Sequence, residues 1–532
     1  MPRWHSPPPF QPPLSSAAPE SSAPVPSDAA AGAPGPTPRS PMDLSLPEAV
    51  RLAFENNNNL RVRRLDPAVA ATEIEFERAA FDPVISASAG LRAERERILA
   101  NSDRNSGGVV RGGVVTGGAG GGSGNQVRGL REYAARSGWN QLLPTGTQYG
   151  FDVQWVADDT NRTTPDHFSK IGLSLVQPLL RGFGPEFQLT GIELAVRNTE
   201  LSRYQFEEAA MDLALAVERA YWDLTLAKLN YAAQLELVDS GRRRLSDNTE
   251  RVRLGRLGVD DRDLLQDRAA LAVREEGLLR IENQVQLARL NLLRLVNPLG
   301  RDGFWGTDLQ TYVPELEPDR LPVPPDAEAA TRTALANRPE LRQAQLGVAV
   351  NEIEIRRARN ALLPQLDVAF DYGPTGHGGR LDSSVRNVGD WRFYDLALST
   401  QFSWAVGNRA AAARTDRAEL TRSRSERNID DVEQAIQLDV RLALQQLDNS
   451  AKRLKAALAA QTLNAEKLAL TVEAKDKGRR DIDEFIVLQF QDDLTNSRQL
   501  VNQAVTDYLR ALSQLRRADG TILKLRGLEV RW

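Results

Sequence analysis

Two short acidic clusters are the residues of this 532-residue chain whose types and spacing could do chemistry. Each cluster follows a glycine, and together they comprise Asp260, Asp261 and Asp263 after Gly255, and Asp481, Asp483 and Glu484 after Gly478. Clustered carboxylates attract cations, and the crowding of like charges raises the pKa of some members. Aspartates that cap helices at a solvated hairpin end would use the same residues. Both interpretations require that the surrounding elements be identified.

Composition argues against several other kinds of site. The chain has no cysteine, which excludes disulfides, thiolate metal sites and a cysteine nucleophile. Its three histidines, His5, His167 and His377, are far apart in sequence, which argues against a histidine-based metal or acid–base site. The net charge of −4 is made of evenly mixed acids and bases, unlike the basic stripe of a nucleic-acid binder. We therefore predict no enzyme activity, no metal, no cofactor and no nucleic-acid partner.

The sequence contains an internal repeat. Residues 168–182 align without a gap on residues 393–407, and Gly255 and Asp260 recur as Gly478 and Asp483. Such an internal repeat predicts two copies of one unit, here helix, strand, strand, helix, helix. We expect a disordered Pro/Ala/Ser-rich segment over 1–42, repeats over 43–298 and 326–522, a proline-rich linker over 299–325 and a tail over 523–532.

Four segments alternate with the period of a strand: about 83–98, 145–178, 364–374 and 391–405. In the second of these, Tyr149, Phe151, Val153 and Trp155 alternate with polar residues or glycine. We expect glycine-rich loops between the strands, over 101–140 and 373–390. A small antiparallel sheet with one wet face gives the same alternation. The alternating runs inside these segments are about ten residues long and carry aromatics near their ends, and both features favour membrane strands.

Long coiled-coil helices should follow the second strand of each repeat. No proline occurs between Glu186 and Asn297, and apolar residues such as Val217, Leu224, Tyr231 and Val238 recur every seven residues. A sustained seven-residue step predicts coiled-coil packing. A helix over 187–253 would be on the order of 100 Å long. A soluble coiled-coil rod would show the same heptads.

Pro178, Gly182 and Gly407 are predicted to join the strands to these helices. Pro178 cannot donate to a sheet, so pairing should end there, and the repeated glycines should turn the chain.

Four membrane strands cannot close a barrel alone, because small closed barrels need about eight. Because an open edge cannot lie in lipid, the strands must be shared among subunits. Three chains would give 12 strands, which is an even number within the range of such barrels. We thus expect a mainly α protein with a β-barrel contribution, whose trimer forms a 12-stranded barrel above a long α-helical barrel.

The chain resembles the TolC family of outer-membrane efflux and secretion channels over about residues 43–522. The segments that carry the resemblance are FDPVISASAG at 81–90, QPLLRGFGPEF at 177–187, NRPEL at 337–341, ALLPQLDVAFDYG at 361–373, FSWAVGNR at 402–409 and LQFQDDLTNSR at 488–498. The resemblance implies a homotrimer in the outer membrane whose helices cross the periplasm. It also implies a periplasmic adaptor and an inner-membrane pump as partners. The family's proline is replaced by Ala405, and a signal peptide and a lipid-bearing cysteine are not readable.

The acidic clusters then become candidates for the gate at the periplasmic entrance, which is acidic in the TolC family. Gly255, Gly258 and Gly478 become candidates for the tips that dock the adaptor. The alternative function is a soluble coiled-coil scaffold with a small antiparallel sheet, which the unreadable signal peptide favours.

Overall fold

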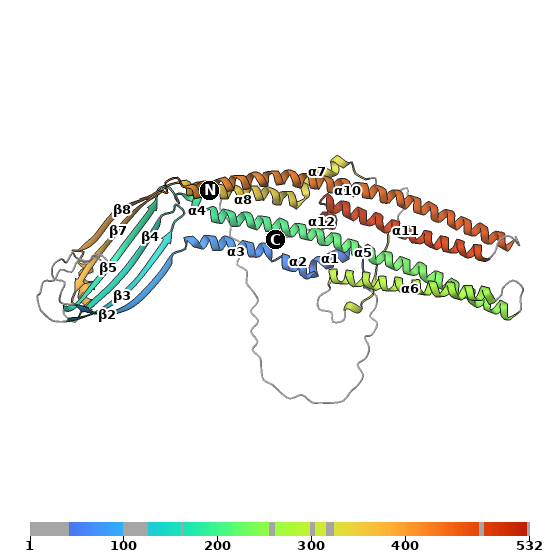
Figure 1. Ribbon diagram of the computed structural model, residues 1–532, viewed down its shortest axis with the longest axis horizontal. Coiled ribbons are helices and arrows are strands. Elements are labelled where there is room, and N and C mark those ends of the chain that lie inside the picture. Colours follow the sequence, from blue (N-terminus) through green and yellow to red (C-terminus); the bar gives the residue numbers. More distant parts are fainter. Residues whose placement is uncertain are drawn as a thin grey trace, which may run out of the picture.

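The computed structural model describes residues 42–98, 126–160, 163–254, 261–297, 304–314, 324–477 and 484–528. The molecule is elongated, with a β-sheet at one end and two long helical hairpins that reach the other end (Figure 1). Shorter helices, among them α3 (Asp66–Arg78) and α8 (Pro339–Leu362), accompany the hairpins over the half nearer the sheet (Figure 1).

The sheet is antiparallel and its strands lie in chain order. They are β2 (Val84–Ile98), β3 (Gln126–Leu142), β4 (Gln148–Thr160), β5 (Thr163–Pro178), β7 (Gln365–Gly378) and β8 (Tyr394–Ser403). The pairing of β5 with β7 joins the two sequence repeats in one continuous sheet. The predicted antiparallel sheet is therefore confirmed.

The predicted number of strands was wrong, because the sheet has six strands and not four. The segment 145–178 contains two strands, β4 and β5, and most of β3 lies within 101–140, which we expected to be a loop. β4 ends at Thr160 and β5 begins at Thr163, so the polar run from Asp158 to His167, which includes Pro165, lies mostly within the two strands and was not taken as a boundary. In β3 the sequence Ala134-Ala135 offers little contrast between the two faces, which hid the alternation. The expected loop 373–390 also contains the end of β7 and a short helix, α9 (Leu381–Gly389).

The long helices form two hairpins, as the heptads predicted. In the first repeat α5 (Thr190–Arg253) packs against α6 (Asp261–Val296), and in the second α10 (Arg409–Asp476) packs against α11 (Glu484–Ala518). The heptad residues Val217, Leu224 and Val238 are fully buried. At 1.5 Å per residue, α5 and α10 are each about 100 Å long. No helix in the described part of the chain is both long enough and apolar enough to cross a bilayer.

Shorter helices lead from the middle of the molecule to the sheet. In the first repeat they are α1 (Leu46–Asn56), α2 (Asn58–Arg63), α3 (Asp66–Arg78) and the 3-10 turn η1 (Ala79–Phe81). In the second repeat they are α7 (Ala327–Asn337) and α8 (Pro339–Leu362). Helix α4 (Pro185–Gln188) follows β5, and α12 (Ile522–Leu525) ends the second repeat.

Part of the predicted linker is ordered against the helices. After the 3-10 turn η2 (Phe304–Gly306), strand β6 (Leu309–Gln310) pairs in parallel with β1 (Met42–Asp43). Leu309 is only 2% exposed, and the Tyr221 hydroxyl of α5 donates to the Leu44 carbonyl at 3.0 Å. The start of the first repeat and the linker are therefore held together on α5.

Candidate functional site

The sheet has one apolar face that spans all six strands. Residues that pair across neighbouring strands form an apolar row made of Ile85, Trp139, Phe151, Leu173, Tyr372 and Leu396. No other part of the described chain covers the two ends of this row: Ile85 is 81% exposed and Leu396 is 56% exposed. An exposed apolar face of this width marks a surface that contacts either lipid or another protein.

The opposite face of the sheet is polar and tightly fitted. Asp152 lies between Gly138 and Gly172 on the two neighbouring strands, and Arg136 pairs with it at 3.3 Å. A Cβ atom on Gly172 would lie 2.6 Å from the Oδ1 atom of Asp152. The glycines therefore make room for this carboxylate, and the fit fixes the register of β3, β4 and β5.

The residues predicted to join strand to helix lie where the sheet ends. Pro178 is the last residue of β5, and Gly182 follows it with a φ of 84°. Gly407 lies between β8 and α10 with a φ of 81°. Because these φ values belong to the left-handed region, glycine is the residue that adopts them without strain. Asn360 of α8 accepts from the Gly182 amide at 2.9 Å, which ties the two repeats together at the turn.

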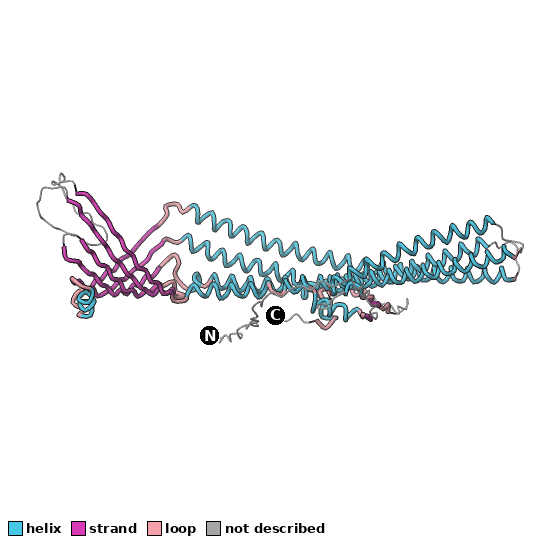
Figure 2. The backbone as a smooth tube through the Cα atoms, turned by 90° about the horizontal axis from the view of Figure 1, so that it is seen from below, coloured by secondary structure: helices cyan, strands magenta, loops and turns pink. Residues whose placement is uncertain are grey.

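The ends of both helical hairpins lie at the end of the molecule opposite the sheet (Figure 2). Asp261 and Asp263 belong to the first turn of α6, and Glu484 begins α11, with side chains outside the described part of the structure. The other acidic and glycine candidates of the tips, Gly255, Gly258, Asp260, Gly478, Asp481 and Asp483, also lie outside the described residues. Further along the hairpins, Arg274 of α6 pairs with Asp492 of α11 at 2.7 Å.

A half-buried ionic cluster joins four helices in the middle of the molecule. Glu340 at the start of α8 pairs with Arg338 at 2.8 Å and with Arg517 of α11 at 2.9 Å. Arg338 also pairs with Asp439 of α10 at 2.9 Å, and Arg517 with Asp212 of α5 at 2.8 Å. Burial disfavours ionisation of Glu340, but the hydrogen bond from Arg338 and the two guanidinium charges outweigh it and lower the pKa of Glu340 to about 2. The sequence showed this cluster only as part of the NRPEL motif.

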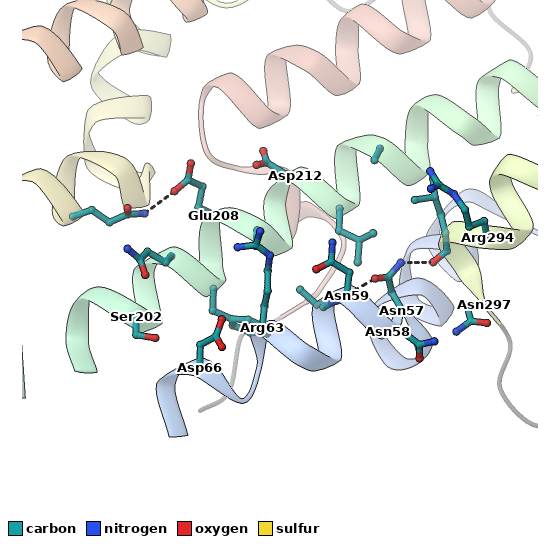
Figure 3. A pocket seen from close by; sticks show the side chains of 18 of the residues that line it. Asn57, Asn58, Asn59, Arg63, Asp66, Ser202, Glu208, Asp212, Arg294 and Asn297 are labelled. Atoms are coloured by element: carbon teal, nitrogen blue, oxygen red, sulfur yellow. Dashed lines mark hydrogen bonds between the residues drawn. The ribbon is translucent and has the colours of Figure 1, made fainter. Parts of the chain in front are cut away.

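The first repeat has an open groove at the corresponding level (Figure 3). Its volume is about 990 Å³, and amides of Asn57, Asn58 and Asn59 line it together with Arg294 and Asp212. Asn57 occupies the place of Arg338 in the repeat, and its side chain donates to the Leu295 carbonyl at 2.9 Å. This groove offers hydrogen-bond donors and acceptors to a polar group, and the ionic cluster of the second repeat has no copy here.

Neither a protein-family model nor a curated protein sequence matches this chain. Solved structures do match it. The CmeC outer membrane channel of Campylobacter jejuni is 18% identical, with a TM-score of 0.63 over 90% of this chain and 85% of that one. The MtrE outer membrane channel of Neisseria gonorrhoeae, in its open state, is 17% identical, with a TM-score of 0.60 over 90% of this chain and 89% of that one.

The chain has the outer-membrane channel fold. VceC, an outer membrane protein of Vibrio cholerae, is 13% identical and matches 89% of this chain with a TM-score of 0.59. The resemblance to the TolC family that the six motifs indicated is thus confirmed at the level of the fold. Since the outer-membrane channel fold includes both the sheet and the helical hairpins, the apolar face and the helix ends must be interpreted together.

Proposed function

We propose that the chain is one subunit of a homotrimeric exit duct in the outer membrane. One observation carries the proposal: a sheet whose exposed face is apolar on all six strands continues directly into helices about 100 Å long. The apolar face would contact lipid, the polar face would line the duct, and the helices would extend into the periplasm. The likeness to outer membrane channels supports this orientation.

The duct would be passive and would have no catalytic activity of its own. We propose that it serves a tripartite efflux pump or a type I secretion system, in which an inner-membrane pump supplies the energy through a periplasmic adaptor. The helical hairpin ends would form the entrance. There the acids Asp260, Asp261, Asp263, Asp481, Asp483 and Glu484 are the proposed gate, and Gly255, Gly258 and Gly478 the proposed docking tips.

The internal repeat supports assembly, because the contacts between the two repeats within one chain predict equivalent contacts between neighbouring chains. Within the chain the two repeats meet where β5 pairs with β7. The outer strands β2 and β8 each have one unpaired edge in the described sheet. If β8 pairs with β2 of the next copy, the same kind of contact recurs around a ring and no edge is left in lipid.

The exposure of equivalent side chains in the two repeats also supports contacts between chains. Helix α8 packs against both α5 and α10, whereas its counterpart α3 packs against α5 and leaves its other side open. Ile355 of α8 is 7% exposed, but Phe76, which occupies the same place in α3, is 71% exposed. Burying one aromatic side chain of this kind contributes about 2 kcal/mol. The α10 helix of a neighbouring copy is the element that would cover Phe76.

One contact in the chain identifies a specific pair of residues to test. Arg357 pairs with Glu354 at 3.2 Å and also donates to the Thr190 hydroxyl of α5 at 2.9 Å. Arg78 repeats the first pair, with Glu75 at 2.7 Å, and among the described residues of its own chain α3 does not pack against α10. Thr415 lies eight residues after Gly407, as Thr190 lies eight residues after Gly182. We therefore expect Arg78 of one copy to meet Thr415 of the next.

Cysteine cross-linking tests the assembly, and the chain has no native cysteine to interfere. The variant Arg78→Cys with Thr415→Cys, treated in isolated outer membranes with a short bis-maleimide, should give bands of two and three chains. The matched control, Arg357→Cys with Thr190→Cys, should cross-link within one chain and keep the size of a monomer. A soluble monomer with no bands between chains would refute the duct and support the coiled-coil scaffold instead.

A further inference from the structure

The strand hairpin formed by β3 and β4 is an insertion into the first repeat. In the second repeat α8 leads into β7, which pairs directly with β8, which leads into α10. In the first repeat α3 and η1 lead into β2 and β5 leads into α4 and α5, but β3 and β4 lie between β2 and β5. The hairpin is thus the one part of the described sheet that the repeat does not duplicate.

The inserted hairpin is a full member of the sheet. It pairs with β2 over 15 residue pairs, from Val84 with Asn140 to Ile98 with Gln126. It also continues both faces: Trp139 and Phe151 extend the apolar row, and Asp152 belongs to the polar face. A hairpin that projected away from the sheet would have no reason to keep lipid-facing and polar residues in register with its neighbours.

The turn of the hairpin is fitted into the junction between sheet and helices. The Gly184 amide donates to the Thr145 carbonyl at 3.0 Å, and the Gln141 side chain donates to the Phe81 carbonyl of η1 at 3.0 Å. Gly146 has a φ of 88°, and a Cβ atom there would lie 2.5 Å from the Gly182 carbonyl oxygen. The turn therefore bridges the end of η1 and the start of α4, two places where a helix and a strand meet.

The hairpin also makes the width of the sheet match the width of the helices. Four helices per chain, α3, α5, α8 and α10, meet the sheet. At 8–10 Å between helix axes they span an arc of about 32–40 Å. Four strands tilted by about 40° span about 25 Å, whereas six span about 37 Å. With six strands, the barrel and the ring of helices can share one diameter without a constriction at the junction.

We propose that three copies of this chain close an 18-stranded barrel, in which β2 of each copy pairs with β8 of the next. The inference rests on the proposed trimeric duct and concerns the size of its membrane part. Strand β2 runs away from the helices and β8 runs back toward them, so the new pair is antiparallel like the rest of the sheet. The expected backbone diameter is about 36 Å, against about 24 Å for 12 strands.

Two cysteine pairs report whether the hairpin lies inside the barrel of the assembled protein. The pair Ala89→Cys with Ala135→Cys joins β2 to β3, and Val153→Cys with Ile171→Cys joins β4 to β5, both at positions that face each other. The matched control, Phe370→Cys with Leu398→Cys, joins β7 to β8 and is independent of the hairpin. All three pairs should form disulfides in most chains of the membrane-inserted ring.

Electron microscopy of the ring in lipid nanodiscs measures the diameter directly. The full chain should show a barrel about 36 Å wide. A variant in which a short loop replaces residues 99–162 should assemble with β2 next to β5 and narrow the barrel to about 24 Å. A ring of full-length chains that is about 24 Å wide, in which only the control pair cross-links, would overturn the 18-stranded barrel and leave the duct intact. A chain that forms no ring in the membrane would instead overturn the proposed function.

Discussion

Replacing Glu340 by glutamine should weaken the protein by an amount that depends on pH. The Glu340 carboxylate is 19% exposed and accepts from both Arg338 and Arg517, which are themselves buried. Its pKa is about 2 in the folded chain, against an ordinary value of 4.5. Because the pKa of Glu340 is lower in the folded chain than in the unfolded chain, its ionised carboxylate stabilises the folded protein above pH 4.5. This contribution is lost as the pH falls from 4.5 toward 2.

The expected magnitude follows from that difference in pKa. At 1.36 kcal/mol per unit, the contribution of the ionised carboxylate at pH 7 is about 3 kcal/mol. The same linkage gives about 2 kcal/mol at pH 3.5 and less than about 0.5 kcal/mol at pH 2. Glu340→Gln should therefore lower the free energy of unfolding by about 3 kcal/mol at pH 7 and by progressively less in acid.

The assay is urea unfolding in detergent, followed by the helical circular dichroism signal at several pH values. The protein concentration is held constant, because assembly contributes to the apparent free energy of unfolding. Glu466→Gln is the matched control, since Glu466 is an exposed glutamate of α10. A loss below about 1 kcal/mol at pH 7 would refute the reasoning, as would a loss of equal size at pH 7 and pH 3.5.

Two further predictions concern the membrane surface and the entrance. Val153→Arg places a charge on the apolar face of β4 and should cost about 2–4 kcal/mol in the bilayer, whereas Gln154→Arg on the polar face should be tolerated. The yield of heat-modifiable trimer in the membrane fraction measures the effect of each variant. Equal yields for Val153→Arg and Gln154→Arg would contradict the assignment of the apolar and polar faces. Asp260→Lys with Asp483→Lys should lower the cation conductance of single channels in planar bilayers and weaken its block by divalent cations. Unchanged conductance and block would remove these acids from the proposed gate.

Local patterns in the sequence were sufficient for much of the fold. The seven-residue step of Val217, Leu224 and Val238 predicted coiled-coil helices, because helical packing repeats over a short distance along the chain. The alternation in β4 predicted a strand, and the equivalent glycines Gly182 and Gly407 predicted the turns from strand to helix. Both signals likewise lie within a few neighbouring residues. The internal repeat then indicated a second copy of the same unit.

Contacts between distant residues decided the rest. Strand β3 has weak alternation and is recognised only through its pairing with β2 and β4, and the pairing of β4 with β5 divides the predicted strand 145–178 in two. For these two reasons the sequence predicted four strands where the sheet has six. Glu340 and Arg517 are 177 residues apart, and no periodicity links them. The sequence determined the long helices and the apolar faces of the strands that alternate clearly, because those properties are set by residues that are close together in the chain. Only the tertiary structure determined the number of strands and the ionic cluster, because strand pairing and buried charge pairs join residues that the chain itself keeps far apart.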